Sequence, residues 1–345
     1  MNPKTSAREI PYLAQRSRKG SITGVQILGV GSYVPDNRVR NEDLASLGYD
    51  AEWIVQRTGI LERRHAPPEL ATSDLAVEAA RRCLADAGVD PAEVDLVLLG
   101  TYTPDMTMPA AASLVQEKLK LCAPAMDIQA ACTSFMFALL TGMQFVASGC
   151  AKRPLVIGAD CNSRVCNPAD VKTYPLFGDG AGAVLLGPGD RSQGFIAFSY
   201  GSDGAGFDLL YRPMGGSRCP TNHQGTLNGE QYVVMEGRPV FKWAIRMLNQ
   251  TVHDVLEMAD LTLADISLVI FHQANMRIIQ AAAEAIGIPS EKLYNNLDRY
   301  GNTSSASIPI CLDEAVREGR IRKGDLVLLS GFGGGLSWAT GILRW

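Results

Sequence analysis

The chain contains two copies of one helix-end, turn and strand pattern, and this duplication limits the folds open to it more than any other feature. The first copy, AGVDPAEVDLVLLG, covers residues 87–100, and the second, ADLTLADISLVIFH, covers residues 259–272, which lie 172 positions later. A second apolar strand, LVIGAD from Leu155, has its counterpart 171 positions later in LVLLSG from Leu326. Landmarks that share nearly the same offset predict two copies of one α/β unit.

The duplication also predicts how the chain is divided. We expect an N-terminal arm over residues 1–20, a first half over residues 21–190 and a second half over residues 191–345. Apolar strands that alternate with helical patterns are typical of layered α/β folds with buried sheets. The helices expected after Cys132 and after Asn302 are apolar or rich in small residues, which suits the centre of such a fold.

Composition excludes several functional classes. The net charge is -4, from 32 basic and 36 acidic residues, whereas a general nucleic-acid binder needs a basic surface. No apolar run reaches the roughly 18–20 residues that cross a bilayer, and we recognise no secretory signal, so we expect a cytoplasmic protein with reduced cysteines. The eight cysteines and four histidines are not spaced as metal ligands, and we expect no metal site. The basic residues 1–20 fit a plain arm better than a transit peptide.

Cys132 is the candidate nucleophile. It follows a predicted strand, PAMDIQAA, and precedes an apolar helix, so it lies where a helix N-terminus favours the thiolate over the thiol. A free buried cysteine is more often a small core residue than a nucleophile. The strand-to-helix junction favours the catalytic interpretation here.

Two further residues each have a structural and a chemical interpretation. His272 ends the apolar run ISLVIF before a helix start, and it is either a hydrogen-bonded core histidine or a catalytic donor. Asn302 lies in YGNTSS, which is typical of a turn and a helix cap formed by Thr303 or Ser304, without excluding a catalytic amide. The duplication puts Cys132 and Asn302 at equivalent helix starts, so we expect them to meet His272 at one site.

The strings AACTSF, FHQAN and YGNTSSAS, with GVGSYVP at 29–35 and EWIVQRTGI at 52–60, closely resemble β-ketoacyl-acyl-carrier-protein synthase III of the thiolase superfamily. The resemblance extends from about residue 21 to Trp345. A histidine with an asparagine, in place of the two histidines of elongating ketosynthases, is typical of the initiating and chalcone-synthase-like branch. The resemblance implies a thiolase-like five-layer αβαβα homodimer that uses acyl-CoA as a substrate and needs no cofactor.

The activity that this resemblance implies is a decarboxylative Claisen condensation. Cys132 would accept an acyl group from acyl-CoA, and His272 and Asn302 would stabilise the enolate formed when malonyl-acyl-carrier protein loses CO2. The backbone N–H groups of Cys132 and Gly334 would form the oxyanion hole. On their own, the glycines at 333–335 also fit a plain tight turn. The product would be a 3-oxoacyl thioester that begins fatty-acid synthesis.

The resemblance also implies contacts with the substrates and with a carrier protein. Trp53 and Arg57 match positions that meet the CoA nucleotide, where an indole stacks on adenine and a guanidinium pairs with phosphate. Asn275 matches a pantetheine contact, and Met108 matches the side chain with which a partner subunit closes the acyl pocket. The expected carrier-protein docking residues, for which a solvated helix face is an equally good interpretation, are Lys242, Arg246 and Arg277.

The chain departs from the family pattern directly after the nucleophile. Relatives usually have a small residue and a glycine where this chain has Thr133 and Ser134, and we expect the added side chains to narrow the acyl tunnel. A specialised-metabolite ketosynthase or acyltransferase of the same fold, with another starter or acceptor, is the alternative function. A non-catalytic protein of this fold would need a damaged site, and all three expected catalytic residues are present.

Overall fold

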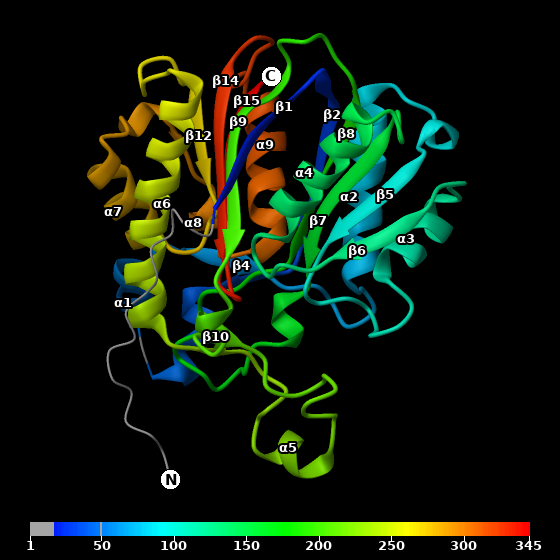
Figure 1. Cartoon of the computed structure of the whole chain (residues 1–345). Coiled ribbons are helices and arrows are strands. Elements are labelled where there is room, and N and C mark those ends of the chain that lie inside the picture. Colours follow the sequence, from blue (N-terminus) through cyan, green and yellow to red (C-terminus); the bar gives the residue numbers. More distant parts are fainter. Residues whose placement is uncertain (1–16, 49) are drawn as a thin grey trace.

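The protein is built from five layers, in which two β-sheets alternate with three layers of helices (Figure 1). The computed structural model describes residues 17–48 and 50–345. The layered α/β fold expected from the sequence is therefore confirmed. No helix in the described part of the chain combines the length and the apolar character needed to cross a membrane.

The first sheet comes from the first half of the chain. Its strand order is β2-β8-β7-β5-β6, with β8 antiparallel to both neighbours and β5 parallel to both of its own. Central strands such as β7 are buried along their whole length, as expected for a sheet covered on both faces. The bounds are β2 (Val25–Tyr33), β5 (Leu96–Gly100), β6 (Ala125–Ile128), β7 (Pro154–Asp160) and β8 (Gly180–Pro188).

The second sheet repeats the first and adds one strand. Its order is β1-β9-β15-β14-β12-β13, and the last five strands reproduce the order and the parallel or antiparallel sense of the first sheet. This correspondence confirms the internal duplication. The bounds are β1 (Arg18–Thr23), β9 (Gly194–Ser202), β12 (Leu268–Phe271), β13 (Leu293–Tyr294), β14 (Leu326–Gly333) and β15 (Ser337–Arg344).

Two helices form the central layer between the sheets. Both α4 (Ser134–Ala147) and α9 (Ser307–Arg317) contact strands of the two sheets. The central core joins residues such as Leu98 of the first sheet, Leu139 of α4 and Leu329 of the second sheet, all fully buried. Most of α4 is buried between the sheets, as its apolar sequence predicts, whereas Phe137, Thr141 and Phe145 are half-buried and Gln144 is exposed.

The outer helices cover the other faces of the two sheets (Figure 1). On the outer helix α6, the buried residues recur every three or four positions and therefore form one apolar face. The outer helices are α2 (Thr72–Ala87) and α3 (Ala111–Leu119) on the first sheet, and α6 (Gly237–Ala259) and α7 (Met276–Ile286) on the second.

The division of the chain differs from the sequence expectation at the N-terminus. Residues 1–16 of the expected arm lie outside the described residues, but the arm boundary at residue 20 is wrong, because β1 begins at Arg18. This strand pairs with β9 of the second sheet, and Lys19 forms an ion pair with Asp254 of α6, with N–O distance 2.9 Å. A short strand that pairs with the second half of the chain has too few residues to show a hydrophobic period, so its start could not be predicted from the sequence.

The remaining elements are short, and most of them lie at the end of the body where the functional site is found (Figure 1). Between β9 and α6 the chain makes an excursion that carries α5 away from the body (Figure 1). The short helices and strands are β3 (Arg38–Arg40), α1 (Ala51–Thr58), β4 (Glu62–Arg64), β10 (Leu210–Tyr211), α5 (His223–Leu227), β11 (Val234–Met235) and α8 (Leu297–Tyr300). The 3-10 helices are η2 (Asn41–Leu47), η3 (Pro91–Glu93), η4 (Asn162–Arg164), η5 (Gly204–Gly206), η6 (Ser290–Lys292) and η7 (Ser304–Ala306).

Candidate active site

Cys132 lies at a tight turn between β6 and α4, two residues before the helix begins. The preceding residue, Ala131, has φ of 49°, a left-handed conformation that side-chain-bearing residues adopt rarely. The Ser134 hydroxyl holds this turn from inside: it accepts from the N–H of Ala130 at 2.8 Å and donates to the carbonyl of Ala131 at 2.6 Å. The turn therefore presents the cysteine from a fixed backbone.

The two residues that distinguish this chain from the family pattern support the turn. The Thr133 hydroxyl donates to the carbonyl of Ser337, and the Ser337 hydroxyl donates to the carbonyl of Ala130. Thr133 and Ser134 are fully buried, and neither lines the cavities beside Cys132. The expectation that they narrow the acyl tunnel is wrong, because their side chains bond to the backbone of the turn and of β15.

The glycine run after β14 packs directly against the nucleophile. A Cβ atom on Gly333 would lie 2.8 Å from the backbone nitrogen of Cys132 and 3.1 Å from its Cβ. Such a contact cannot be relieved by rotating a side chain, so this position needs glycine. The next residue, Gly334, lines the same cavity as Cys132. The close backbone approach expected of this run is present, whereas the role of Gly334 as an oxyanion donor stays a prediction.

His272 follows β12 directly and is fixed from both sides. Its backbone N–H bonds to the carbonyl of Ser330 on β14, and its Nδ1 lies 2.7 Å from the hydroxyl of Ser307 in the first turn of α9. The imidazole also makes an edge contact with Phe332, with ring centroids 5.2 Å apart. The ring orientation is therefore set by both the second sheet and the central helix.

Asn302 lies between α8 and η7 rather than at a strand-to-helix junction. Its backbone N–H bonds to the carbonyl of Leu176, and its own carbonyl accepts from the N–H of Gly178. The side-chain Oδ1 accepts from the backbone N–H of Ser304 at 2.8 Å. The amide nitrogen Nδ2 is thus the end of the side chain available to a substrate oxygen.

The three expected catalytic side chains line one cavity. Cys132, His272 and Asn302 surround a pocket of about 140 Å³ that also receives Asn275 at the start of α7. Apart from these groups its lining is largely apolar, with side chains such as Phe332 and Trp243. The expected convergence of the three strings on one site is therefore present in the structure, although their residues lie far apart in the chain.

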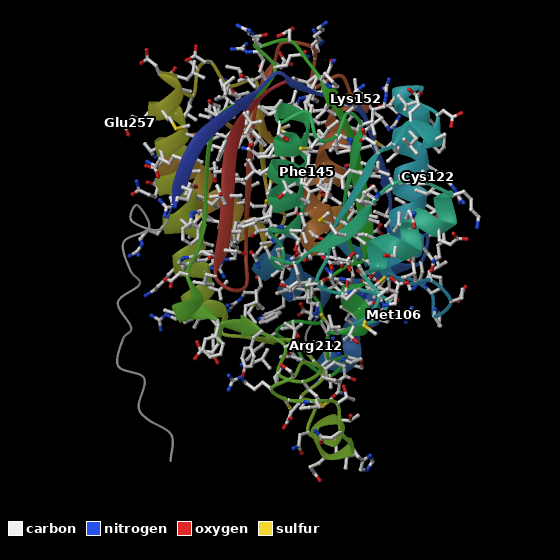
Figure 2. All side chains as sticks on the ribbon, turned by 45° about the vertical axis from the view of Figure 1, so that its right-hand side comes forward. Met106, Cys122, Phe145, Lys152, Arg212 and Glu257 are labelled. Carbon is white, nitrogen blue, oxygen red and sulfur yellow. The ribbon has the colours of Figure 1, made fainter. Side chains whose placement is uncertain are left out.

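A second cavity of about 330 Å³ also reaches Cys132. It is lined by Tyr102 after β5 and by Phe207, Tyr211 and Arg212 of the excursion. Figure 2 shows Arg212 and Met106 at the same end of the body as the excursion. Cys132 therefore borders two adjoining cavities, which also share Phe177 and Leu210.

Burial controls the charge of the two titratable groups. It raises the pKa of the Cys132 thiol to about 12, and a hydrogen bond from Ser304 opposes the shift. Burial lowers the pKa of His272 to about 3. At neutral pH the site thus holds a thiol and a neutral imidazole. The direction of the shift in the Cys132 pKa is opposite to the one expected from the helix N-terminus, and its largest cause is the desolvation of the buried sulfur.

Ser304 is a contact of the nucleophile that the sequence did not single out for this role. It is fully buried, and its hydroxyl donates to the Cys132 sulfur at 3.3 Å. Its φ of 54° turns the chain sharply after Asn302. In the sequence Ser304 was a possible helix cap, and only the packing of the two halves reveals the nucleophile 172 residues away.

Asp160, at the end of β7, is a second group that the sequence did not reveal. Its buried carboxylate accepts from the hydroxyls of Thr101 and Thr103 and from the hydroxyl and N–H of Ser305 in η7. Burial raises the pKa of this carboxyl, and the hydrogen bonds from Ser305 oppose that shift. The carboxylate fastens the turn after Asn302 to the first half of the molecule.

The expected CoA contacts gather where α1 meets α7. Trp53 and Arg57 both lie on α1, with the guanidinium 5.3 Å from the centroid of the indole ring. Asn275 caps α7, and its Nδ2 donates to the carbonyl of Arg57 at 3.2 Å. Trp53 and Arg57 do not line the two cavities beside Cys132, whereas Asn275 does. The structure brings these residues together, and their contact with CoA stays a prediction.

The expected docking residues form an exposed basic stripe close to the place where α1 meets α7. Lys242 and Arg246 are exposed on α6 one turn apart, and Arg277 is exposed in the first turn of α7, which packs beside α6. Arg238 extends the stripe by one turn, and the sequence analysis did not single it out. A spacing of four along α6 is the signal that could have found it.

Met108 lies away from both cavities of its own chain. It is 84% exposed in the loop after β5, together with Met106 at 45% and Met126 on β6 at 38%. Strand β6 is the edge of the first sheet. Three exposed methionines beside an open strand edge form an apolar surface.

Across residues 17–48 and 50–345, no group of three or more histidine, cysteine, aspartate or glutamate side chains has an arrangement that could hold a metal ion. The expectation that no cofactor is needed stays a prediction.

Comparisons with known proteins identify the family. The family described as 3-Oxoacyl-(acyl-carrier-protein) synthase III matches residues 126–204, and its C-terminal part matches residues 256–345. The β-ketoacyl-(acyl-carrier-protein) synthase III of Rhodopirellula baltica is 52% identical over 344 residues, which cover 94% of this chain and 100% of the relative.

Solved structures agree with this assignment. The 3-oxoacyl-(acyl-carrier-protein) synthase III of Aquifex aeolicus is 41% identical, with a TM-score of 0.85 over 93% of this chain and 100% of its own. A priming β-ketosynthase of a polyketide biosynthetic pathway is 35% identical, with a TM-score of 0.85 over 94% of this chain and 96% of its own. The chain belongs to the 3-oxoacyl-(acyl-carrier-protein) synthase III family.

Proposed function

We propose that the protein catalyses the decarboxylative condensation of an acyl-CoA with malonyl-acyl-carrier protein, and so initiates fatty-acid synthesis. The observation that carries the proposal is the shared cavity of Cys132, His272 and Asn302. A nucleophile and two neutral hydrogen-bond donors suit chemistry in which a carbanion forms beside a thioester.

The first half-reaction is acyl transfer to the nucleophile. The Cys132 sulfur attacks the thioester carbon of acyl-CoA, and its proton passes to the CoA sulfur that leaves. The bond between the acyl carbon and Cys132 replaces the bond to CoA. Negative charge on the tetrahedral oxygen is met by the backbone N–H groups of Cys132 and Gly334, and one such donor typically contributes about 3 kcal/mol.

The second half-reaction forms the carbon–carbon bond. When the malonyl group loses CO2, the electron pair of the broken bond moves into the thioester as an enolate, which then attacks the acyl carbon and expels the Cys132 sulfur. The expelled sulfur takes up one proton from solvent, which restores the thiol. Asn302 donates through Nδ2, because its Oδ1 is held by Ser304. His272 donates through Nε2, a tautomer that the Ser307 hydroxyl supports when it donates to Nδ1.

The proposed substrate contacts follow from the residues that lie where α1 meets α7, beside the cavity of Cys132, His272 and Asn302. CoA would place its nucleotide on Trp53 and Arg57 and its pantetheine beside Asn275, which caps the helix that lines the cavity. The acidic carrier protein would dock on the basic stripe that contains Lys242, Arg246 and Arg277.

We further propose a homodimer that works in the cytoplasm. The exposed methionines beside the open edge of β6 support an interface at this face, and Met108 of one subunit would then close the second cavity of its partner. All eight cysteines are free thiols, which suits a reducing compartment.

One relative favours a second candidate function. The polyketide-priming β-ketosynthase is 35% identical to this chain over nearly its whole length. A starter role in specialised metabolism would keep the same site and change the acyl group or the acceptor. A screen of acyl-CoAs of graded length against malonyl-acyl-carrier protein and malonyl-CoA separates the two functions.

The proposed division of labour is tested with Asn302→Ala. We expect this variant to accept an acyl group on Cys132 at a rate close to wild type, and to release CO2 from malonyl-acyl-carrier protein at least about a hundredfold more slowly. Cys132→Ser is the control and should lose acylation. Equal impairment of both half-reactions in Asn302→Ala would remove the special role of the amide.

A further inference from the structure

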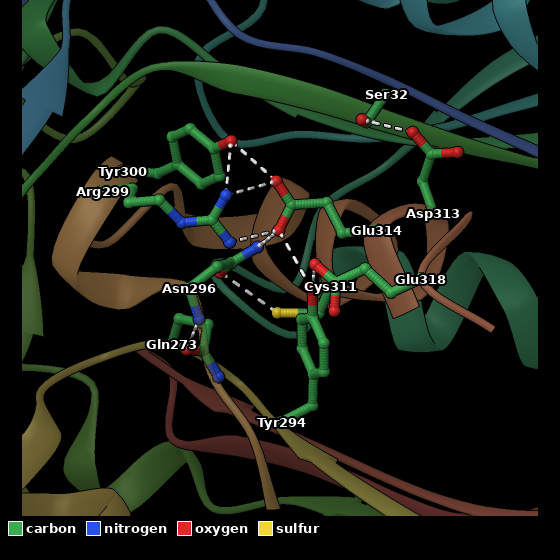
Figure 3. A network of polar contacts seen from close by, with 10 residues as sticks. All are labelled: Ser32, Gln273, Tyr294, Asn296, Arg299, Tyr300, Cys311, Asp313, Glu314 and Glu318. Carbon is green, nitrogen blue, oxygen red and sulfur yellow. Dashed lines mark hydrogen bonds and ion pairs between the residues drawn. The ribbon is translucent and has the colours of Figure 1, made fainter. Parts of the chain in front are cut away.

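Glu314, two turns into the central helix α9, accepts hydrogen bonds from three side chains and lies close to the hydroxyl of a fourth (Figure 3). Its Oε1 accepts from the Tyr300 hydroxyl at 2.7 Å, and its Oε2 accepts from Asn296 Nδ2 at 2.9 Å. The Arg299 guanidinium bridges both oxygens, at 3.2 and 2.8 Å, and the Tyr294 hydroxyl lies 3.4 Å from Oε2. One carboxylate thus organises a whole segment.

All four side chains belong to one stretch of chain, residues 294–300, which comprises the end of β13 and the helix α8. This stretch leads directly into Gly301 and Asn302. Tyr300 is two residues before Asn302, and its ring also stacks with Arg64, at 5.7 Å from the guanidinium carbon. Glu314 therefore anchors the chain immediately ahead of the amide that faces the cavity.

The same cluster reaches the histidine side of the site. The N–H of Asn296 donates to Oε1 of Gln273, the residue after His272, at 3.1 Å. Gln273 in turn donates to the carbonyl of Phe271 at 2.8 Å. The first residue of α9, Ser307, contacts the His272 ring. Helix α9 thus contacts the residues after β12 directly through Ser307, and indirectly through the bonds from Glu314 to Asn296 and from Asn296 to Gln273. Glu314 also bonds to Tyr300, in the segment that precedes Asn302.

An ordinary surface ion pair does not account for this arrangement. An exposed arginine–carboxylate pair contributes about 0–1 kcal/mol and needs no other partners. Here the Glu314 side chain is 17% exposed, and it also satisfies two neutral donors, Tyr300 and Asn296. Burial, followed by the hydrogen bond to Glu314, raises the pKa of Tyr300 to about 12.

We propose that Glu314 is a positioning residue for the decarboxylation half-reaction: its carboxylate fixes residues 294–300 on α9 and so holds Asn302 and the end of β12 in register. The inference rests on the proposed function, and it assigns to Glu314 no contact with a substrate. The carboxylate can accept at both oxygens, which a glutamine cannot. In Glu314→Gln one set of donors must therefore face an NH2 group.

The test compares Glu314→Gln with Glu318→Gln. Glu318 lies one turn further along the chain, is exposed and accepts only from the Tyr294 hydroxyl among these donors, at 2.9 Å, so it is a matched control. We expect Glu314→Gln to slow malonyl decarboxylation at least about tenfold while acylation of Cys132 stays within about twofold of wild type. Glu318→Gln should leave both rates within about twofold.

A second measurement does not depend on activity. Hydrogen exchange of the backbone amides of residues 297–304 should become at least about tenfold faster in Glu314→Gln and should stay unchanged in Glu318→Gln. Unchanged exchange in Glu314→Gln, equal loss of both half-reactions, or the same effects in Glu318→Gln would overturn the inference. A wild-type protein that releases no CO2 from malonyl-acyl-carrier protein would instead refute the proposed function, and the exchange measurement would still decide whether Glu314 anchors the segment.

Discussion

At the nucleophile, burial keeps both the thiol and the imidazole uncharged at neutral pH. The pKa of Cys132 is raised to about 12 and that of His272 is lowered to about 3. The two groups therefore do not form a thiolate–imidazolium pair. Because the unfolded chain binds a proton on His272 below pH 6.5 and the folded chain does not, the neutral imidazole also makes folding less favourable as the pH falls from 6.5 toward 3.

This charge state predicts the pH dependence of Cys132 reactivity. The rate of S-alkylation by iodoacetamide should rise about tenfold per pH unit from about pH 6 to about pH 9, because the thiolate fraction grows in that proportion below the pKa. Mass spectrometry of the Cys132 peptide separates this signal from the exposed Cys122 and Cys150. A rate that levels off below about pH 8 would mean that an ion pair exists after all.

A site residue can be predicted from the sequence when its neighbours in the chain mark it, and not when only a residue far away in the chain does. Cys132, His272 and Asn302 each lie in a local string that resembles a known family, so all three could be named from the sequence. Ser304 and Asp160 act through partners 172 and 145 residues away, and no local pattern records such contacts. Thr133 and Ser134 were misjudged because their hydroxyls turn back to the backbone.

At the scale of elements, the site depends on contacts between strands of one half of the chain and turns of the other half. Strand β7 carries Asp160, which fastens the turn η7 after Asn302. The end of β14 carries Gly333, which packs on the backbone of Cys132. The strands and central helices were predicted from their apolar patterns. The contacts of Asp160 and Gly333 each depend on a single residue, so no repeating pattern in the sequence indicates them.

The hydrogen bonds that the Asp160 carboxylate accepts should contribute strongly to the stability of the fold. Asp160→Ala leaves the buried hydroxyls of Thr101 and Thr103 without their acceptor and removes one of the two acceptors near the Ser305 hydroxyl, so we expect the free energy of unfolding to fall by about 3 kcal/mol. Chemical denaturation monitored by tryptophan fluorescence measures the change. Asp190→Ala, in an exposed turn, is the control, and equal effects of the two substitutions would contradict the account.

At the scale of the whole molecule, the duplication places the cavity between two equivalent sheets. Five strands of each half share one order, and the two central helices start beside the nucleophile and beside Asn302. The repeat was visible in the sequence because two strand patterns recur at one offset. The extra strand β1 has no copy in the first sheet, which is why the arm boundary was misplaced.

The open edge of the first sheet predicts the oligomeric state. Light scattering should give about twice the chain mass of 37.1 kDa for the wild type, and Met108→Lys should shift the population toward the monomer because it buries a charge. Leu227→Lys on α5, where the residue is 68% exposed, is the matched control and should not change the mass. A monomeric wild type, or the same shift in Leu227→Lys, would contradict the proposed interface.

The most direct test of the central claim follows the acyl group through the molecule. The protein is incubated with acetyl-CoA and with longer acyl-CoAs, digested and examined by mass spectrometry, before and after a chase with malonyl-acyl-carrier protein. The account predicts one acyl group on Cys132 that disappears in the chase as a 3-oxoacyl-carrier protein forms. An unmodified Cys132 with every acyl-CoA, or an acyl group that the chase releases only as free acid, would contradict it.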